Sequence, residues 1–326
     1  MANDLRAARS YLVDVQNVTI RFRRKRTLGA ILGNVPATFR AVAEADLAIA
    51  RQEVVGLVGE SGSGKTTLGR TILRLYEPDD GSIIFEGKDI THLREHQLRN
   101  VWRRMALVFQ DPLSSLNPRH TVHAALATPL RIGARVNPRE IDDRVQAALR
   151  RVGLPLDAQA RYPHELSGGQ LQRVALARAL MLSPALVIAD EAVSKLDVSV
   201  RSQILNLFKD LQAELRISFL FVTHDLHVAK YISDRIAVMF FGRIVETAPT
   251  DELFRAPRHP YTRALLSTID DRDDETVVRR GAVDPDAAGC IYRSQCPRAL
   301  ARCREAHPPT ALIGPGHSLA CYNPSQ

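Results

Sequence analysis

The chain has 326 residues, of which 45% are hydrophobic, and a formal net charge of +8. This length allows one large domain with a smaller addition, and the composition is apolar enough for a packed core. No stretch approaches the ~20 uninterrupted apolar residues of a membrane span, and no signal-peptide segment opens the chain. We therefore expect a cytoplasmic protein or one attached to a membrane from that side. The positive charge leaves two partners open, nucleic acid and an anionic membrane surface.

The first two predicted elements are strands. Residues 11–22 alternate enough between apolar and polar side chains to indicate an edge strand, and residues 39–50 predict a second strand. Phe22 ends the first of them. Its ring could stack on a nucleotide base, because every purine offers a π face, or it could pack in the sheet. Both interpretations of Phe22 stay open.

A phosphate-binding loop follows. Residues 54–58 form a short apolar run typical of a buried parallel strand, and residues 68–75 carry apolar side chains at helical spacing. Between them, Gly59–Thr66 matches the GxxxxGK[ST] pattern at every fixed position. Such glycines let backbone N–H groups surround a phosphate, and the helix N-terminus adds partial positive charge. Lys65 is expected to reach the β and γ phosphates, and the Thr66 hydroxyl to ligate Mg²⁺.

This strand–loop–helix context predicts a nucleoside triphosphate site. The residues expected to contact the nucleotide are Gly59, Ser61, Gly62, Gly64, Lys65, Thr66 and Thr67.

Further along, residues 82–85 predict a strand, and another strand ends at Phe109, before Gln110. Between Leu113 and Arg161 strand signals stop and helical patterning dominates, with prolines as punctuation. We interpret this segment as a helical insertion in an α/β domain.

Two later strands end in polar residues. Residues 185–189 predict a buried strand that ends at Asp190 and Glu191, and residues 218–222 predict one that ends before His224. Acidic residues at the carboxyl end of such a strand are expected beside the phosphate loop of a doubly wound sheet. Residues 236–246 predict a closing hairpin across Gly242.

The order of these motifs resembles the ATP-binding subunits of ABC transporters over residues 11–270. The shared set is the phosphate loop, Gln110, the LSGGQ segment at 166–170, Asp190-Glu191, the SxLD segment at 194–197, and His224. Three further segments resemble the oligopeptide/dipeptide importer branch: QDPLSSLNPR (110–119), LDVSVRSQILNLF (196–208) and HPYTRALL (259–266). The tail 289–322 is similar to the C-terminal extension of that branch.

This resemblance implies an α/β fold: a P-loop ABC ATPase core with a mixed sheet and helices. It implies a nucleotide-binding domain over residues 1–270 with the helical insertion at about 111–180. Residues 271–326 would form a small cysteine-rich extension.

The resemblance also implies roles for particular residues. Glu191 would polarise the attacking water, Asp190 would hold Mg²⁺ through a water, and His224 would contact the γ-phosphate. Gln110 would bind both Mg²⁺ and the attacking water. Phosphoryl transfer needs such positioning and charge compensation more than covalent catalysis.

A dimer is implied as well. Ser167 and Gly169, with Gly168 and Gln170 beside them, would contact the ATP of a partner subunit, and Asp197 would lie on the loop that spans the interface. Two residues depart from the family pattern, Ala192 in place of proline and Lys195 in place of alanine. Neither removes a catalytic group, but both could weaken turnover.

The four cysteines all lie in the tail, at Cys290, Cys296, Cys303 and Cys321. This spacing does not match the CxxC pairs of a zinc ribbon, and Cys₄ ligation suits a [4Fe–4S] cluster. Some importers with this tail carry such a cluster, so the resemblance favours it over zinc or unligated thiols. Because no residue expected to touch phosphate lies after His224, we expect the tail to affect ATP chemistry little.

The sequence therefore predicts an ATPase, with ATP and Mg²⁺ as cofactors, that powers a peptide importer. Its partners would be a second ATPase subunit (a heterodimer or a homodimer), two membrane permeases and, indirectly, an extracytoplasmic solute-binding protein. It would lie peripherally on the cytoplasmic face of the inner membrane and bind no nucleic acid. The alternatives are a regulatory subunit with weak hydrolysis and a soluble ABC protein that acts on nucleic acid or ribosomes. The transported solute is not readable from this subunit.

Overall fold

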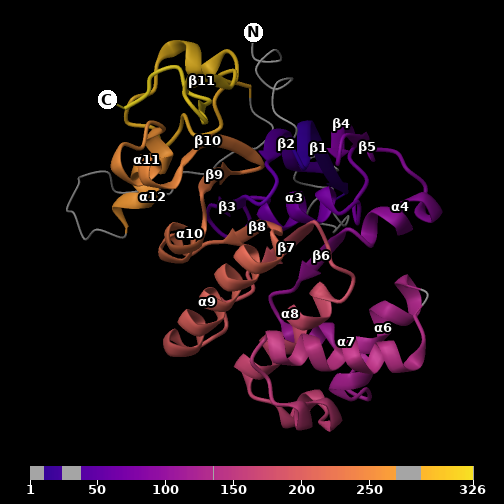
Figure 1. Cartoon of the computed structure of the whole chain (residues 1–326). Coiled ribbons are helices and arrows are strands. Elements are labelled where there is room, and N and C mark those ends of the chain that lie inside the picture. Colours follow the sequence, from indigo (N-terminus) through magenta and orange to yellow (C-terminus); the bar gives the residue numbers. More distant parts are fainter. Residues whose placement is uncertain (1–10, 24–37, 135, 269–287, 326) are drawn as a thin grey trace, which may run out of the picture. The chain divides into compact units, whose positions relative to one another are not determined.

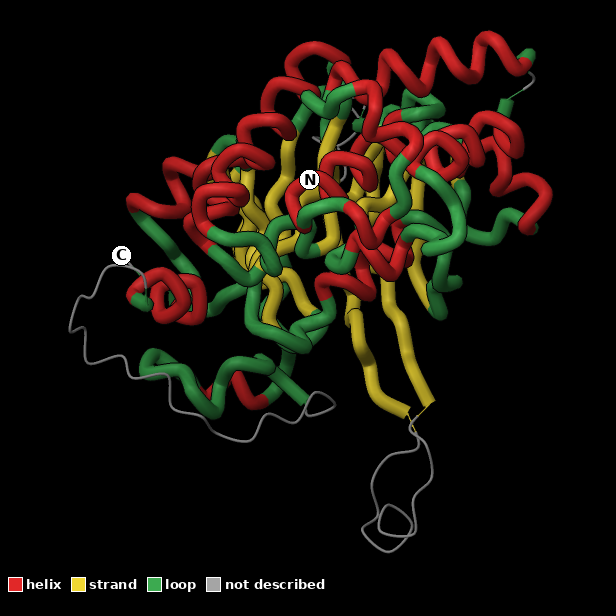
Figure 2. Tube along the Cα trace, turned by 90° about the horizontal axis from the view of Figure 1, so that it is seen from below, coloured by secondary structure: helices red, strands yellow, loops and turns green. Residues whose placement is uncertain are grey.

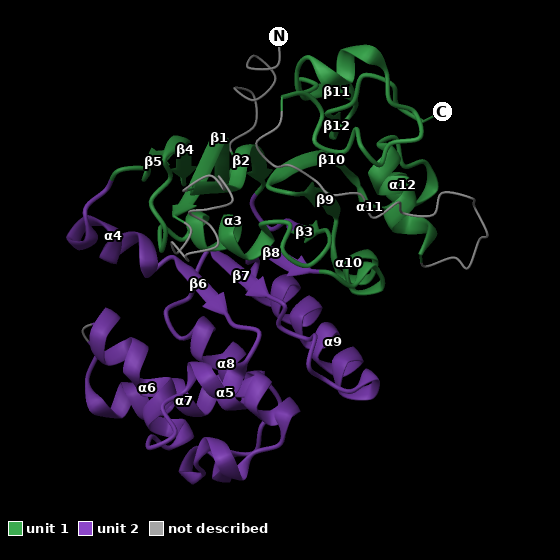
Figure 3. Cartoon of the chain, turned by 180° about the vertical axis from the view of Figure 1, so that it is seen from behind, with its two compact units in different colours: residues 1–50, 55–92, 224–326 green, residues 51–54, 93–223 purple. Residues whose placement is uncertain are grey.

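We describe a computed structural model of the chain, which covers residues 11–23, 38–134, 136–268 and 288–325 (Figure 1). The chain divides into two compact units, drawn in green and purple in Figure 3. The first comprises residues 1–50, 55–92 and 224–326, and the second comprises residues 51–54 and 93–223. Figure 2 shows their helices in red and their strands in yellow.

The first unit contains a four-stranded antiparallel sheet in the order β2-β1-β4-β5. Its strands are β1 (Val13–Arg23), β2 (Thr38–Ile49), β4 (Asp80–Phe85) and β5 (Lys88–Asp89). The prediction of an edge strand near residues 11–22 is wrong, because β1 lies between β2 and β4. Alternation of apolar and polar residues indicates that one face of a strand is buried, but it does not show how many strands pair with it. The second neighbour of β1 is β4, which comes from a distant segment of the chain.

The other strands of the first unit run in the order β11-β12-β10-β9-β3. They are β3 (Val54–Val58), β9 (Arg235–Phe240), β10 (Arg243–Pro249), β11 (Ala311–Gly314) and β12 (His317–Leu319). β3 and β9 are parallel and the remaining pairs are antiparallel, so the arrangement is mixed. The predicted hairpin across Gly242 is confirmed as β9 and β10. The tail supplies β11 and β12, which the sequence did not predict.

One hydrophobic cluster joins the strands of this unit to the tail. It includes Val58 at the end of β3, Phe240 on β9, Tyr261, and the tail residues Cys290 and Tyr292. The helices of the unit are α3 (Lys65–Ile72), α10 (Leu226–Ile232), α11 (Thr250–Arg255) and α12 (Pro260–Ser267). The tail is thus part of the core of the first unit and not an appendage to it.

The second unit contains three parallel strands in the order β8-β7-β6. They are β6 (Met105–Val108), β7 (Leu186–Asp190) and β8 (Ser218–Thr223), and every residue of β7 and β8 is buried. Burial on both faces is usual for parallel strands and explains their continuous apolar sequences.

The helices of the second unit are α4 (Glu95–Trp102), α5 (Pro112–Ser115), α6 (Val122–Gly133), α7 (Pro138–Arg151), α8 (Gly168–Leu180) and α9 (Val198–Leu215). Polar side chains define where several begin: Thr121 caps α6, and Asn137 accepts the Glu140 N–H at 2.9 Å at the start of α7. Helices α5 to α8 occupy the segment predicted as a helical insertion.

The predicted α/β architecture with a mixed sheet and helices is confirmed. Among the described residues, no helix combines the length and the apolar character that crossing a membrane requires.

Candidate functional site

The loop Gly59–Thr66 connects the buried strand β3 to helix α3. Gly59 and Gly64 have φ values of 154° and 104°, which side-chain-bearing residues rarely adopt. A Cβ at Gly59 would lie 2.1 Å from the Met239 carbonyl oxygen, and one at Gly64 would lie 2.3 Å from the Ala41 carbonyl oxygen. Both glycines are therefore required by backbone that approaches the loop from β9 and β2.

Lys65 holds this loop in a closed shape. Its side chain is only 4% exposed, and its Nζ donates to the carbonyls of Gly59 at 2.8 Å and Glu60 at 2.7 Å and to the Ser63 hydroxyl at 3.3 Å. Gly64, at the N-cap of α3, has no side chain with which to cap the helix. The site therefore joins an ammonium group to a helix N-terminus, which is a suitable arrangement for an anion.

A residue of the C-terminal region also touches the loop. The Glu60 backbone N–H donates to the Tyr261 hydroxyl at 3.3 Å, and Tyr261 is 1% exposed. His259 caps α12 by accepting the Tyr261 N–H on Nδ1 at 3.1 Å. Burial lowers the pKa of His259 to about 4, so the ring is neutral and its Nδ1 is an acceptor.

Sequence reasoning missed the role of Tyr261, because HPY at 259–261 served only as a family marker. The sequence did contain a signal for this residue: Tyr261 directly follows His259 and Pro260, a pair that is typical of a helix start. The expectation that no residue touching phosphate lies after His224 stays a prediction, but Tyr261 shows that the C-terminal region contacts the backbone of the phosphate loop.

Phe22 packs against two other aromatic rings. Its ring centroid lies 6.0 Å from that of Phe39 and 5.4 Å from that of Tyr76, the latter edge-to-face. These contacts fit the packing interpretation, and base stacking by Phe22 stays a prediction.

His224 directly follows β8 and is exposed. The next residue, Asp225, caps α10 by accepting the N–H groups of His227 at 2.9 Å and Val228 at 3.2 Å. The helix start thereby fixes the backbone beside His224. Its contact with a γ-phosphate stays a prediction.

In the second unit, Gln110 and Glu191 form a hydrogen-bonded pair. Gln110 follows β6 closely and Glu191 directly follows β7, and these strands are parallel neighbours, so their carboxyl ends lie at one edge. The Gln110 Nε2 donates to the Glu191 carboxylate at 2.6 Å. Glu191 has a φ of 50°, a strained backbone conformation of a kind that clusters at functional sites. Asp190, the last residue of β7, is buried.

The LSGGQ segment forms the start of α8. Ser167 is the N-cap: its hydroxyl accepts the Gln170 N–H at 3.3 Å, and the Gln170 side chain accepts the Ser167 N–H at 3.0 Å. This reciprocal capping box fixes the first turn. A Cβ at Gly169 would lie 2.7 Å from a Val200 methyl group, so the second glycine permits close packing of α8 on α9.

The two departures from the family pattern have different surroundings. Ala192 is buried, at 2% exposure. Lys195 is exposed, and its Nζ lies 3.6 Å from a carboxylate oxygen of Asp111, the residue after Gln110. Asp197 precedes α9 as its exposed N-cap.

The four cysteines share one part of the first unit. Cys290 and Cys303 are buried, and Cys296 and Cys321 are half-buried. The thiol pKa values of Cys290, Cys296 and Cys321 are raised, first by burial, with neighbouring cysteines of the set adding to the shift; that of Cys290 reaches about 11.

Each of these sulfurs also accepts a backbone N–H. Leu300 donates to Cys303 and Asn323 to Cys321, both at 3.4 Å, while Tyr292 donates to Cys290 and Arg298 to Cys296. In the described part of the chain, no three His, Cys, Asp or Glu side chains stand close enough together to hold a metal ion. The cysteines are therefore neighbours with prearranged donors, but not an assembled coordination shell.

A buried histidine attaches the tail to β10 and α11. His317, 1% exposed, contacts Glu246 through Nε2 at 2.9 Å and Glu252 through Nδ1 at 2.8 Å. Burial raises the pKa of Glu246, but hydrogen bonds from His317, Thr262 and two backbone N–H groups outweigh it, so the net shift is downward. Burial lowers the pKa of His317, and the two carboxylates more than reverse this.

The comparisons with known proteins agree with this geometry. The ABC transporter family matches residues 42–194. The solved ATP-binding cassette MJ0796, in a dimeric post-hydrolysis state with ADP and Pi, is 29% identical, has a TM-score of 0.65, and covers 73% of this chain and 98% of its own. CbiO1 from Clostridium perfringens, part of an ABC transporter complex, is 25% identical with the same TM-score and covers 82% of this chain and 97% of its own. The fold and the phosphate loop thus define an ABC-type ATP-binding cassette.

The branch follows from the C-terminal region and from whole-length relatives. The family described as the C-terminal region of oligopeptide/dipeptide transporters matches residues 245–303. The oligopeptide transport ATP-binding protein AppF of Bacillus subtilis is 43% identical over 87% of this chain and 89% of its own length. A protein of Brucella ovis, provisionally named a peptide import ATP-binding protein, is 46% identical over 87% of this chain and 92% of its own. The chain belongs to the oligopeptide/dipeptide branch of ABC transporter ATP-binding proteins.

Proposed function

We propose that this chain is the ATP-hydrolysing subunit of an ABC importer for peptides, peripheral on the cytoplasmic face of the membrane. The observation that carries the proposal is the closed loop Gly59–Thr66. Its buried Lys65 ammonium donates to the loop carbonyls of Gly59 and Glu60. A triphosphate would draw this ammonium onto phosphate oxygens. The names of the relatives supply the peptide substrate class.

In the proposed reaction, the loop backbone, Lys65 and the start of α3 would hold the β and γ phosphates, and the Thr66 hydroxyl would hold Mg²⁺. Mg²⁺ neutralises charge on the phosphates when bound. Glu191 orients the attacking water and polarises it, and Gln110 contacts that water. The hydrogen bond of 2.6 Å between Gln110 and Glu191 supports a shared task for these two groups. Asp190 would help to hold Mg²⁺, and His224 would contact the γ-phosphate.

The working unit is proposed to be a dimer of cassettes, homomeric or with a related second subunit. Ser167 to Gln170 begin α8 with a fixed first turn and an exposed cap, which suits an anion presented from outside. That anion would be the γ-phosphate of the partner subunit's ATP, with Asp197 at the interface. The neighbour MJ0796 was solved as a dimer.

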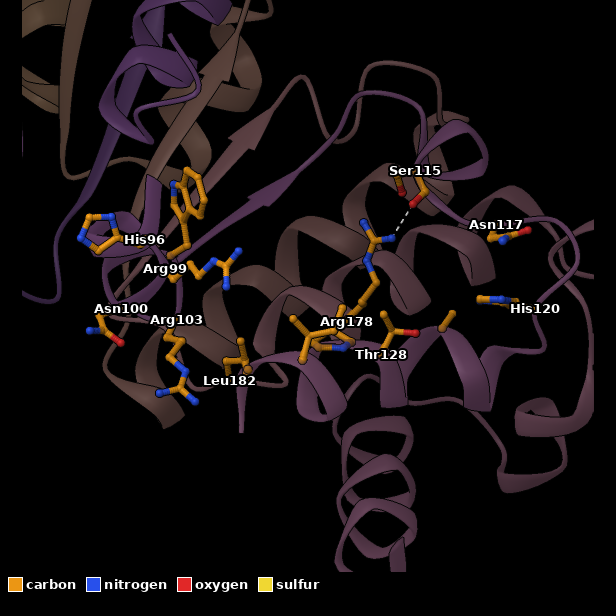
Figure 4. A pocket seen from close by; sticks show the side chains of 15 residues that line it. His96, Arg99, Asn100, Arg103, Ser115, Asn117, His120, Thr128, Arg178 and Leu182 are labelled. Carbon is orange, nitrogen blue, oxygen red and sulfur yellow. Dashed lines mark hydrogen bonds between the residues drawn. The ribbon is translucent and has the colours of Figure 1, made fainter. Parts of the chain in front are cut away.

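Two membrane permease subunits are the proposed docking partners, and a solute-binding protein acts through them. A cavity of about 930 Å³ lies within the second unit, lined by α4, α6 and α8 (Figure 4). Ile132, 83% exposed, and Leu182 supply apolar surface, while Arg99 and Arg103 add positive charge. Arg178, whose guanidinium donates to the Ser115 carbonyl, supports the cavity from α8. This surface suits a short cytoplasmic segment with apolar side chains.

Docking is tested by capturing the tagged chain from membranes. Ile132→Asp should lose the membrane subunits while its affinity for MgATP stays at the wild-type value. Leu312→Asp, at an apolar residue of β11 with 55% exposure, is the control and should retain them. Retention by Ile132→Asp would contradict docking at this cavity.

The four cysteines are proposed to hold a [4Fe–4S] cluster. Their common location and the N–H group donated to each sulfur support this ligand set, because such donors favour thiolates in metal sites. When bound, the cluster would tie Cys290, Cys296 and Cys303 to Cys321. Anaerobically purified protein should then contain iron and sulfide at near four each per chain. Stoichiometric zinc without iron, under iron-replete conditions, would contradict the cluster.

A second candidate function is a regulatory cassette with weak hydrolysis. The ion pair of Lys195 with Asp111 favours it, because it restrains the segment that carries Gln110. The rate of phosphate release by the complex captured from membranes separates the two functions. The leading proposal predicts turnover that disappears in Lys65→Ala; binding of ATP without turnover supports the regulatory cassette. Capture of ribosomes or nucleic acid in place of membrane subunits contradicts both.

A further inference from the structure

The hydroxyl of Tyr261 is the point where the C-terminal region touches the phosphate loop. It accepts the N–H of Glu60 at 3.3 Å, and the carbonyl of Glu60 in turn accepts the Lys65 ammonium at 2.7 Å and the Ser63 N–H at 3.2 Å. The backbone N–H of Glu60 is therefore bonded to the C-terminal region, and its backbone carbonyl is bonded to the loop itself. Tyr261 thus bears on the carbonyl that positions Lys65.

The ring of Tyr261 is itself held by two aromatic neighbours. Its centroid lies 4.4 Å from that of Phe240 and 5.5 Å from that of Tyr292, and the Phe240 and Tyr292 rings meet edge-to-face at 5.2 Å. All three rings are at most 2% exposed. Interiors packed this closely transmit displacements because there is no void to absorb them.

Tyr292 connects this trio to the cysteines. It lies between Cys290 and Cys296 in the chain, and its backbone N–H donates to the Cys290 sulfur. The backbone N–H of Cys290 donates to the Cys303 carbonyl at 2.8 Å. A continuous series of contacts within the first unit thus runs from two cysteines through Tyr292 and Tyr261 to Glu60.

We propose that Tyr261 is a positioning residue for the phosphate loop and that the cysteine tail sets its position through Tyr292. The affinity of the loop for MgATP then depends on the integrity of the tail. The inference rests on the proposed ATP-binding function. It assigns His259 and Pro260 the task of starting α12 so that Tyr261 reaches the loop.

The energetic reason is preorganisation. A loop held in its binding conformation before the phosphate arrives loses less freedom on binding, which raises affinity. Loss of one neutral hydrogen bond changes an equilibrium by about twofold to tenfold. The effect should fall on nucleotide affinity and on KM, since Tyr261 touches no group proposed for the chemical step.

The first test is Tyr261→Phe in the full chain, which keeps the ring and removes the hydroxyl. MgATP affinity, measured by displacement of a fluorescent ATP analogue, should weaken about twofold to tenfold, with kcat at saturating ATP unchanged. Tyr322→Phe is the matched control: it removes a tail hydroxyl that contacts the His307 carbonyl instead of the loop. An unchanged affinity in Tyr261→Phe overturns the inference. If wild type fails to bind MgATP, the proposed function itself fails.

The second test is a double-mutant cycle. Tyr292→Ala removes the ring contact with Tyr261 and should weaken MgATP binding in the wild-type background but not further in Tyr261→Phe. Cys290→Ser, which alters the sulfur that accepts the Tyr292 N–H, should show the same non-additivity. Tyr292→Phe retains the ring and should bind as wild type does. Equal weakening by Tyr292→Ala in both backgrounds would mean that the tail does not act through Tyr261.

Discussion

The phosphate loop and the Gln110–Glu191 pair differ in how firmly each is held. Lys65 is nearly inaccessible, donates to three groups of its own loop, and directly follows Gly64, where the close approach of the Ala41 carbonyl leaves no room for a side chain. Gln110 is exposed and donates to the half-buried Glu191 carboxylate at 2.6 Å, and Glu191 has a strained backbone with a φ of 50°. The loop is a preformed receptor, whereas the Gln110 side chain of the pair is open to solvent.

This contrast suggests a division of labour between binding and chemistry. A receptor gains affinity from rigidity, while a group that orients and polarises water acts on the barrier to the chemical step. Variants of the loop should therefore change affinity, and variants of the pair should change turnover.

The largest expected effect is that of Glu191→Gln. Removal of the group that polarises water should lower kcat by about a hundredfold to ten-thousandfold, while the Kd for MgATP stays at the wild-type value. Steady-state phosphate release by the assembled complex measures it. Turnover within a few-fold of wild type would remove Glu191 from the proposed role.

Lys65→Ala should weaken the binding of MgATP by the phosphate loop. Loss of the ammonium that reaches the phosphates should weaken MgATP binding about tenfold to a hundredfold, since hydrogen bonds to charged groups are the stronger kind. Equilibrium binding of a fluorescent ATP analogue gives the value. An unchanged Kd with reduced kcat would place Lys65 with the chemistry and reverse the proposed division.

The tail provides a prediction about stability. His317→Gln removes a buried charge partner of Glu246 and should lower the free energy of unfolding by about 3 kcal/mol. The folded-state pKa of His317 is raised above its ordinary 6.5, so its contribution is complete below that pH and is lost as pH rises through the raised value. The folded-state pKa of Glu246 is lowered below 4.5, so its contribution is lost only in more acidic solution.

The difference between wild type and His317→Gln should therefore be largest near pH 5 to 6.5 and shrink at higher pH. Denaturant unfolding at pH 6 and pH 8.5 measures it. His92→Gln is the matched control, because His92 pairs with Glu77 on the surface, where both side chains are more than 60% exposed. If the difference in the free energy of unfolding between wild type and His317→Gln grew above pH 6.5, the predicted direction of the pH dependence would be wrong.

The smallest effect is expected for Lys195→Ala. The exposed ion pair with Asp111 contributes about 0–1 kcal/mol, so its loss should raise turnover by no more than about fivefold. Lys195→Arg keeps the charge and should behave as wild type does. A fall in turnover in Lys195→Ala would show that Lys195 assists hydrolysis and does not restrain it.

Local patterns were sufficient to predict the phosphate loop. Its glycines, Lys65 and the flanking strand and helix lie within some twenty consecutive residues, and the physical demands on each are local. The hairpin across Gly242 was predictable for the same reason.

Contacts between distant segments were not predictable in the same way. The two neighbours of β1, the pairing of β12 with β10, and the hydrogen bond between Glu60 and Tyr261 all join residues far apart in sequence. Periodicity identifies a buried face but not what covers it. The HPY segment gave a sequence signal for Tyr261, but no pattern in the sequence indicated that its partner is Glu60.

The central claim is that the loop around Lys65 binds ATP and that Glu191 is needed to cleave it. The most direct measurement is the identity of the nucleotide retained by the assembled complex after incubation with MgATP, rapid removal of free nucleotide and acid quenching. We predict ADP in wild type, intact ATP in Glu191→Gln, and no nucleotide in Lys65→Ala. ADP retained by Glu191→Gln in the same amount as by wild type would contradict the claim.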